Sequence, residues 1–100
     1  MAKYRDYHEE LIEYLKDHDG AAAYLNAAWE ESLNGDEESQ QLFLLALRNV
    51  AEAQGGLGKL AKKVRIRREQ LYRMLSPRGN PGLRLVRPLL LALGFSLRFI

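Results

Sequence analysis

Apolar residues recur three or four positions apart along most of this chain, which is the spacing of amphipathic helices. The first such pattern covers residues 4–16, although its aromatic and β-branched residues leave an extended segment open there. A second helix is expected at 21–33. Asp17 or Asp19 can cap it, because a carboxylate accepts bonds from the free backbone N–H groups of a helix start. The sequence therefore predicts two helices before its first Asn-Gly turn signal.

The third pattern begins with three acidic residues, 36–38, which favour a helix start because the positive end of the helix dipole stabilises negative charge. This helix should run to about Gln54 and end at a Gly-Gly pair. Its segment 42–47 is apolar almost all round, so we expect a helix buried on more than one side. The short link that follows requires it to pack directly on the next elements.

Residues 57–75 carry two shorter apolar stripes separated by a tight turn, the pattern of a helix-turn-helix. The apolar positions are Leu57, Leu60, Ala61 and Val64 on the first helix, Ile66 at the turn, and Leu71, Met74 and Leu75 on the second. The second helix of such a unit can lie in the DNA major groove, so this segment indicates DNA binding.

The C-terminal part opens with a loop rich in proline and glycine at 76–82, followed by an apolar helix at 83–93. Pro88 cannot donate a hydrogen bond, so this helix should begin near Arg87 or kink there. Residues 95–100 alternate apolar and polar, which predicts a short strand. Only weak partner strands occur in the chain, so we expect it to pair with a second subunit or a partner protein.

These elements predict one all-α domain of five to six helices with a short C-terminal β-strand. We divide it into a helical extension at 1–35, a helix-turn-helix core at 36–94 and the strand at 95–100. A chain of 100 residues suits one small domain. Its polar N-terminal residues and short apolar runs lead us to expect no secretory signal and no membrane span, and the lack of Cys fits a cytoplasmic location.

The net charge of +2 conceals a strong asymmetry between the two halves. Residues 1–54 hold four basic and twelve acidic side chains, a balance of −8, and residues 55–100 hold eleven basic side chains and one acidic, a balance of +10. Local phosphate neutralisation supplies most affinity for nucleic acids, so the basic half matters more than the mean charge. The acidic half is free to meet a basic protein partner.

The candidate DNA contacts follow from side-chain chemistry. Arg pairs with guanine through two bonds and Gln with adenine, so base reading is assigned to the exposed start of the second helix and to one residue further along: Arg67, Arg68, Gln70 and Arg73. Phosphate contacts are assigned to Lys59, Lys62, Lys63, Arg65, Tyr72 and Arg78. A packing role for Tyr72 stays open, and each cation has a solvated surface side chain as its alternative.

Other classes of function have less support in the residues. A basic amphipathic helix can also be a membrane-surface or calmodulin-type segment, but these helices are short and need their apolar faces for a core. His8 and His18 stand alone among solvent-type residues, the many carboxylates look like helix surface, and no glycine-rich phosphate loop follows a strand. We therefore expect no catalytic residues, no metal site and no cofactor.

Taken together, these residues resemble the probable addiction module antidote proteins, HigA-like antitoxins with a lambda-repressor-like helix-turn-helix. Any one matching piece is short, but they follow one another over nearly the whole chain. The pieces are Tyr14-Leu-Lys-Asp17, Ala22-Ala-Tyr-Leu-Asn-Ala-Ala28, Leu42-Phe-Leu-Leu-Ala-Leu-Arg-Asn-Val-Ala51, Leu60-Ala-Lys62, Leu71-Tyr72, Leu75-Ser-Pro77, Gly79-Asn-Pro81 and Ala92-Leu-Gly94.

The resemblance implies a type II antitoxin that binds a small basic RelE/ParE-like toxin and represses its own operon. We expect the acidic half to contact the toxin, with Tyr24 and Trp29 as aromatic candidates, although Trp29 also suits a core position. We expect a homodimer through the last helix and the strand residues Phe95, Leu97 and Phe99. The alternatives are a phage-repressor-type regulator without a toxin and an adaptor that binds no DNA.

Three residues depart from the pattern of this family. Arg65 stands where Gly is favoured, and a left-handed backbone there costs a non-glycine residue about 1 kcal/mol. Arg67 replaces the Ser that usually caps the second helix, a loss of about 1 kcal/mol. Pro88 interrupts a helix that is normally continuous. The first two departures indicate that DNA affinity is favoured over local stability.

Overall fold

The computed structural model of the protein describes residues 3–33, 35–76 and 83–95. Within these ranges every regular element is a helix and no strand is present, which confirms the all-α class. The helices are α1 (Lys3–Leu15), α2 (His18–Ser32), α3 (Glu37–Ala53), α4 (Leu57–Val64), α5 (Arg68–Met74) and α6 (Leu83–Ala92).

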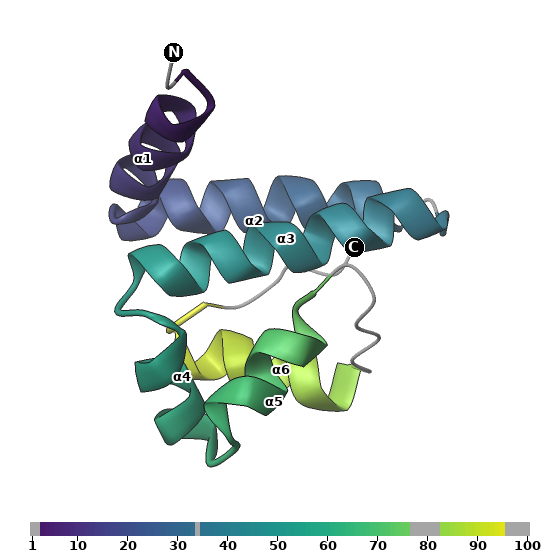
Figure 1. Cartoon of the computed structure of the whole chain (residues 1–100). Helices are drawn as coiled ribbons and strands as arrows, with labels where there is room; N and C mark the ends of the chain where they lie inside the picture. The colour runs from purple at the N-terminus through teal and green to yellow at the C-terminus, as the bar shows by residue number, and fades with distance from the viewer. Residues whose placement is uncertain (1–2, 34, 77–82, 96–100) are drawn as a thin grey trace.

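The helices form two groups around α3 (Figure 1). The long helices α2 and α3 lie antiparallel and side by side, and α1 stands across the end where α2 begins and α3 ends (Figure 1). The shorter helices α4, α5 and α6 form a second group on the opposite side of α3 (Figure 1). The basic helix pair is thus placed far from most of α1, at the other end of the molecule.

The starts of α2 and α3 follow from side-chain caps. Asp17, one of the two caps predicted, accepts a 2.8 Å bond from the backbone N–H of Gly20, so α2 begins three residues earlier than expected. Asp36 accepts a 2.7 Å bond from the N–H of Ser39. Hydrogen bonding by Ser39 holds the pKa of the Asp36 carboxyl below its ordinary value. The acidic start predicted for α3 is confirmed.

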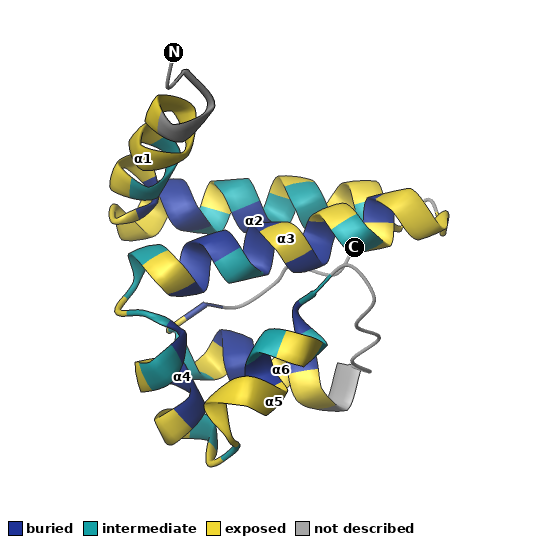
Figure 2. Ribbon diagram, viewed as in Figure 1, coloured by how far each residue is buried: buried dark blue, intermediate teal, exposed yellow. Residues whose placement is uncertain are grey.

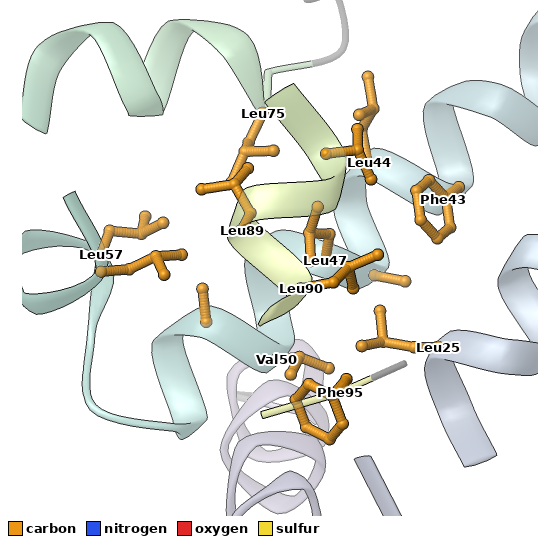
Figure 3. Close-up of a cluster of buried hydrophobic side chains, with 14 of the residues drawn as sticks. Leu25, Phe43, Leu44, Leu47, Val50, Leu57, Leu75, Leu89, Leu90 and Phe95 are labelled. Atoms are coloured by element: carbon orange, nitrogen blue, oxygen red, sulfur yellow. The ribbon is translucent and has the colours of Figure 1, made fainter. Parts of the chain in front are cut away.

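The core is one cluster to which all six helices contribute, with α3 at its centre (Figure 3). Leu47 and Val50 of α3 are fully buried, between Leu25 of α2 on one side and Leu57 of α4 on the other (Figure 3). The expectation that the 42–47 segment lies in a helix buried on more than one side is confirmed, because α3 packs on α1, α2 and α4. Leu42 and Leu45 are 52% and 48% exposed, because nothing in the described structure covers that side of α3.

Three helices end with the same backbone arrangement, in which an N–H donates to the carbonyl five residues earlier. The donors and acceptors are Gly56 to Ala51 (2.9 Å), Ile66 to Ala61 (3.0 Å) and Phe95 to Leu90 (2.9 Å). The residue before each donor has positive φ, which suits Gly55 and Gly94 but leaves Arg65 at φ 60° and ψ 44°. The left-handed conformation expected for Arg65 is therefore confirmed.

The C-terminal part differs from the sequence prediction in two ways. The helix α6 begins at Leu83 and contains Pro88, so it does not start near Arg87; the exposed proline forfeits only the bond to the carbonyl of residue 84. Phe95, expected to begin a strand, is 5% exposed and stacks on the ring of His18, with the ring centroids 4.2 Å apart. The other residues of the predicted strand, 96–100, lie outside the described residues.

Candidate functional site

The α4–α5 pair is the helix pair that the sequence predicted at 57–75. Its inner side is apolar: Leu57, Leu60 and Ala61 of α4 are buried, as are Leu71 of α5 and Leu75 after it. Only residues 65–67 connect the helices, and the Ile66 N–H bond to the Ala61 carbonyl closes the turn. The pair is thus attached to the domain by one face, and its other faces point to solvent (Figure 2).

That solvent-facing surface is strongly basic. All of its cationic side chains, and the amide that was predicted to read adenine, are exposed: Lys59, Lys62, Lys63, Arg65, Arg67, Arg68, Gln70 and Arg73. Among the described residues the two ion pairs join His8 to Glu52 and Lys16 to Glu13, so neither involves α4 or α5. We call these eight side chains the basic surface. None of its cations forms an ion pair with a described acidic side chain, although Glu69 on α5 acts electrostatically on Arg68, so the surface can meet an anionic partner.

The structure brings three of the predicted contacts together in one place. Lys59, Lys62 and Arg68 line a shallow hollow of about 510 Å³ whose other lining residues are Gly58, Ala61 and Ile66. Gly58 borders the Arg68 side chain, and a Cβ on it would lie 3.8 Å from the Arg68 Cδ, an ordinary van der Waals contact. Two phosphate candidates from α4 and one base-reading candidate from α5 therefore share a single cationic concavity.

Tyr72 packs against the core, which is the packing role that the sequence left open. It is half-buried, and its hydroxyl accepts a 3.4 Å bond from Nη2 of Arg68, one turn earlier on α5. The same guanidinium lies 5.4 Å from the ring centroid, within cation–π range. The hydrogen bond to Tyr72 raises the pKa of Arg68 above its ordinary value, so this guanidinium stays charged at any relevant pH. Tyr72 thus orients Arg68.

Arg48 is a basic residue that the sequence analysis did not assign to the site. It comes from α3, in the acidic half, and its Cζ lies 5.2 Å from the centroid of the Tyr72 ring. The signal was present in its helical position, because Arg48 is four residues after Leu44 and three before Ala51, both buried. Only the packing of α3 against the basic pair shows that this face meets α5.

The backbone at the turn explains two departures from favoured residue types. Arg65 holds the left-handed position described above, and Arg67 is the N-cap of α5 with φ −73° and ψ 143° but no side-chain cap bond. Both side chains are exposed. The chain therefore places two cations at positions where Gly and Ser would give the more stable turn.

The remaining predicted residues are spread over the molecule. Tyr24 is half-buried, and its hydroxyl accepts a 3.3 Å bond from the amide of Asn49. Trp29 packs edge-on against Phe43, with ring centroids 5.4 Å apart, as a core position requires. Arg78, Leu97 and Phe99 lie outside the described residues.

No group of three or more His, Cys, Asp or Glu side chains in the described part of the chain is arranged to hold a metal ion. No helix there is long and apolar enough to cross a membrane.

The fold and its surface define a small helical domain with a buried apolar core and one exposed, strongly cationic helix pair. Comparison with known proteins adds the family. The chain belongs to the family described as probable addiction module antidote protein, whose sequence model matches residues 6–100. No curated protein and no solved structure matched. An antidote of this kind implies a toxin as its partner.

Proposed function

We propose that the protein is a DNA-binding antitoxin that neutralises a small basic RelE/ParE-like toxin by direct binding and represses its own operon. The observation that carries the DNA-binding part is the basic surface on α4 and α5, which is exposed and forms no ion pair with an acidic side chain among the described residues. The α4–α5 pair acts as a helix-turn-helix of the lambda-repressor type, and α5 enters the major groove.

Within this proposal, base reading falls to Arg67, Arg68, Gln70 and Arg73 at the exposed side of α5. Phosphates are held by the cations of α4 and the turn, and Tyr72 with Arg48 orients Arg68 from behind. Because the Arg48 guanidinium lies over the Tyr72 ring, we assign Arg48 a positioning role.

The test is the binding of a duplex carrying the chain's own promoter, followed by fluorescence anisotropy at increasing salt. Each neutralised phosphate contributes about −0.9 to the slope of log K against log [salt], so six to eight contacts give a slope of roughly −5 to −7. A random duplex of equal length is the control. Equal affinity for both duplexes, or a slope near zero, would contradict operator recognition.

We also propose that the repressor is a homodimer, because operators of this class are two-fold sites and one short α5 gives limited affinity. Phe95 is occupied by the core of its own subunit, so the dimer contact falls to Leu97 and Phe99 with exposed parts of α6. Removing residues 96–100, which spares Phe95, should yield a monomer in sedimentation velocity. An unchanged sedimentation coefficient would place the dimer contact elsewhere.

Toxin capture separates this function from a phage-repressor-type regulator. The balance of −8 on residues 1–54 supports attraction of a cationic toxin at a surface remote from the basic one. The experiment is co-expression of the tagged chain with the protein encoded beside it and purification of the pair. A neighbouring gene whose product is not retained would favour the regulator without a toxin.

A further inference from the structure

The apolar stripe of α1 is only partly used by the core. Tyr7, Leu11 and Tyr14 follow one another at helical spacing, yet Tyr7 is 78% and Tyr14 57% exposed. Together with the half-exposed Leu45 of α3 they line an open groove of about 730 Å³. The other lining residues are His8, Glu10, Tyr24, Arg48, Asn49 and Glu52.

The walls of this groove are held in place by polar contacts between the helices. The carboxylate of Glu52 on α3 lies 3.2 Å from Nε2 of His8 on α1. At the end of α1, the Gln54 side-chain amide donates to the carbonyls of Leu15 (2.7 Å) and Lys16 (3.2 Å). The groove therefore exists without an occupant, which lowers the ordering cost of binding.

The shape of the groove selects the kind of occupant. Its aromatic side chains are widely exposed, whereas a small-molecule pocket encloses most of its ligand. Tyr7 and Tyr14 are seven residues apart, so they span about 10 Å, or two helical turns. That separation matches the i and i+7 positions of an amphipathic helix laid in a groove.

The charges around the groove indicate that its occupant is positively charged. Glu10 and Glu52 are part of its lining, and Asp6, Glu9 and Glu13 are exposed on the same helix α1. The one cation in the lining, Arg48, lies over the ring of Tyr72. An apolar partner segment with flanking Lys or Arg side chains is therefore complementary to this surface.

We propose that the groove between α1 and α3, anchored by Tyr7, Tyr14 and Leu45, docks an amphipathic basic helix of the toxin. This inference rests on the proposed antitoxin function, which it sharpens: Tyr24 lines the groove and Trp29 does not, and the exposed aromatic side chains of α1 become the main toxin contacts. The occupant presents apolar residues to the tyrosines and cations to the acidic rim.

The probe is a fluorescent helical peptide of about 18 residues, five turns, with leucines on one face and lysines on the other. We expect the full chain to bind it, and Tyr14→Ala and Leu45→Ala each to weaken binding by about tenfold or more. Leu33→Ala is the matched control, because Leu33 is 64% exposed at the far end of α2 and should change nothing. A leucine–glutamate peptide should not bind.

A matched pair of variants tests the acidic side chains around the groove. Glu10→Lys in the groove should weaken binding of the lysine peptide. Glu31→Lys, an equal charge change in the last turn of α2, should leave that binding unchanged. No binding of the lysine peptide, or equal binding by all variants, overturns the proposal. A sedimentation coefficient that changes with Tyr14→Ala also overturns it, because a second copy would then fill the groove.

Retention of the toxin distinguishes this inference from the proposed function. Retention of the co-expressed neighbouring protein by the unaltered chain but not by Tyr14→Ala supports both. Equal retention by the two chains leaves the antitoxin function standing and refutes the groove. If neither chain retains it while peptide binding still depends on Tyr14 and Leu45, the antitoxin function fails and the groove remains a site for basic helices.

Discussion

The basic surface and the α1–α3 groove differ in how the protein supports them. The side chains of the basic surface are long and solvated. The turn between α4 and α5 contains Arg65 in a left-handed backbone conformation and Arg67, an N-cap without a side-chain cap bond. The groove presents rigid aromatic side chains on a helix fixed at its end by Gln54. Charge contacts to phosphate tolerate mobile side chains, whereas apolar docking gains most from anchors that are already ordered.

The two surfaces meet at one residue. Arg48 lines the groove and also lies over the Tyr72 ring that orients Arg68. The acidic residues of the groove, Glu10 and Glu52, belong like Arg48 to residues 1–54. The protein thus keeps opposite charges on opposite ends and joins them through α3, which is also the centre of the core.

The largest expected effect separates the buried side of α3 from its groove side. Leu47→Ala should destabilise the protein by about 2–5 kcal/mol, because Leu47 is fully buried and its loss leaves a cavity. Leu45→Ala, two residues earlier and half-exposed, should change stability by no more than about 0.5 kcal/mol. Urea denaturation of both variants is the measurement. Similar losses would mean that the groove side of α3 is part of the core.

A second pair of substitutions distinguishes residues of the basic surface that contact bases from residues that contact phosphates. Arg68→Ala should lower affinity for the operator by roughly ten- to one-hundredfold while random DNA is affected less, because a bidentate contact to guanine is lost. Lys62→Ala should weaken binding to both duplexes by the same factor. Anisotropy titrations at one salt concentration test this, and equal losses for Arg68→Ala would remove it from the base-reading group.

A smaller effect tests whether the turn is less stable than it could be. Arg65→Gly should stabilise the protein by about 1 kcal/mol, because glycine adopts positive φ without strain. The same change should weaken DNA binding severalfold through the lost charge. Arg65→Ala is the control: it removes the charge equally but keeps the strained backbone. A stability gain in both variants would show that charge repulsion, and not φ, limits the turn.

The smallest effect concerns the acid side of the stability profile. The lowered pKa of Asp36 means that the unfolded carboxyl takes up a proton at higher pH than the folded one, so its contribution is present near neutral pH and fades as pH falls through the folded pKa. Asp36→Ala should therefore lower Tm at about pH 7 and much less at about pH 3. Thermal melts followed by circular dichroism measure the gap. A gap independent of pH would rule out the charged cap.

Local patterns were sufficient for most of the fold. Periodicity located the helices, the acids at 36–38 located the start of α3, and the apolar positions of 57–75 identified the buried side of the α4–α5 pair. The left-handed turn at Arg65 was expected from the family resemblance, in which glycine is favoured at this position. These features depend on interactions within a few residues.

The surfaces depended on contacts between distant segments. An apolar pattern on α1 does not show which of its residues a neighbour will cover, and Tyr7 and Tyr14 lie exposed beside Leu45. Arg48 was counted with the acidic half until the packing of α3 on α5 placed it over Tyr72. Phe95 was read as the start of a strand, and the stacking partner that buries it, His18, is 77 residues away in the sequence. Periodicity records which face of a helix is apolar, but only tertiary packing decides how much of that face the domain covers and how much it leaves for a partner.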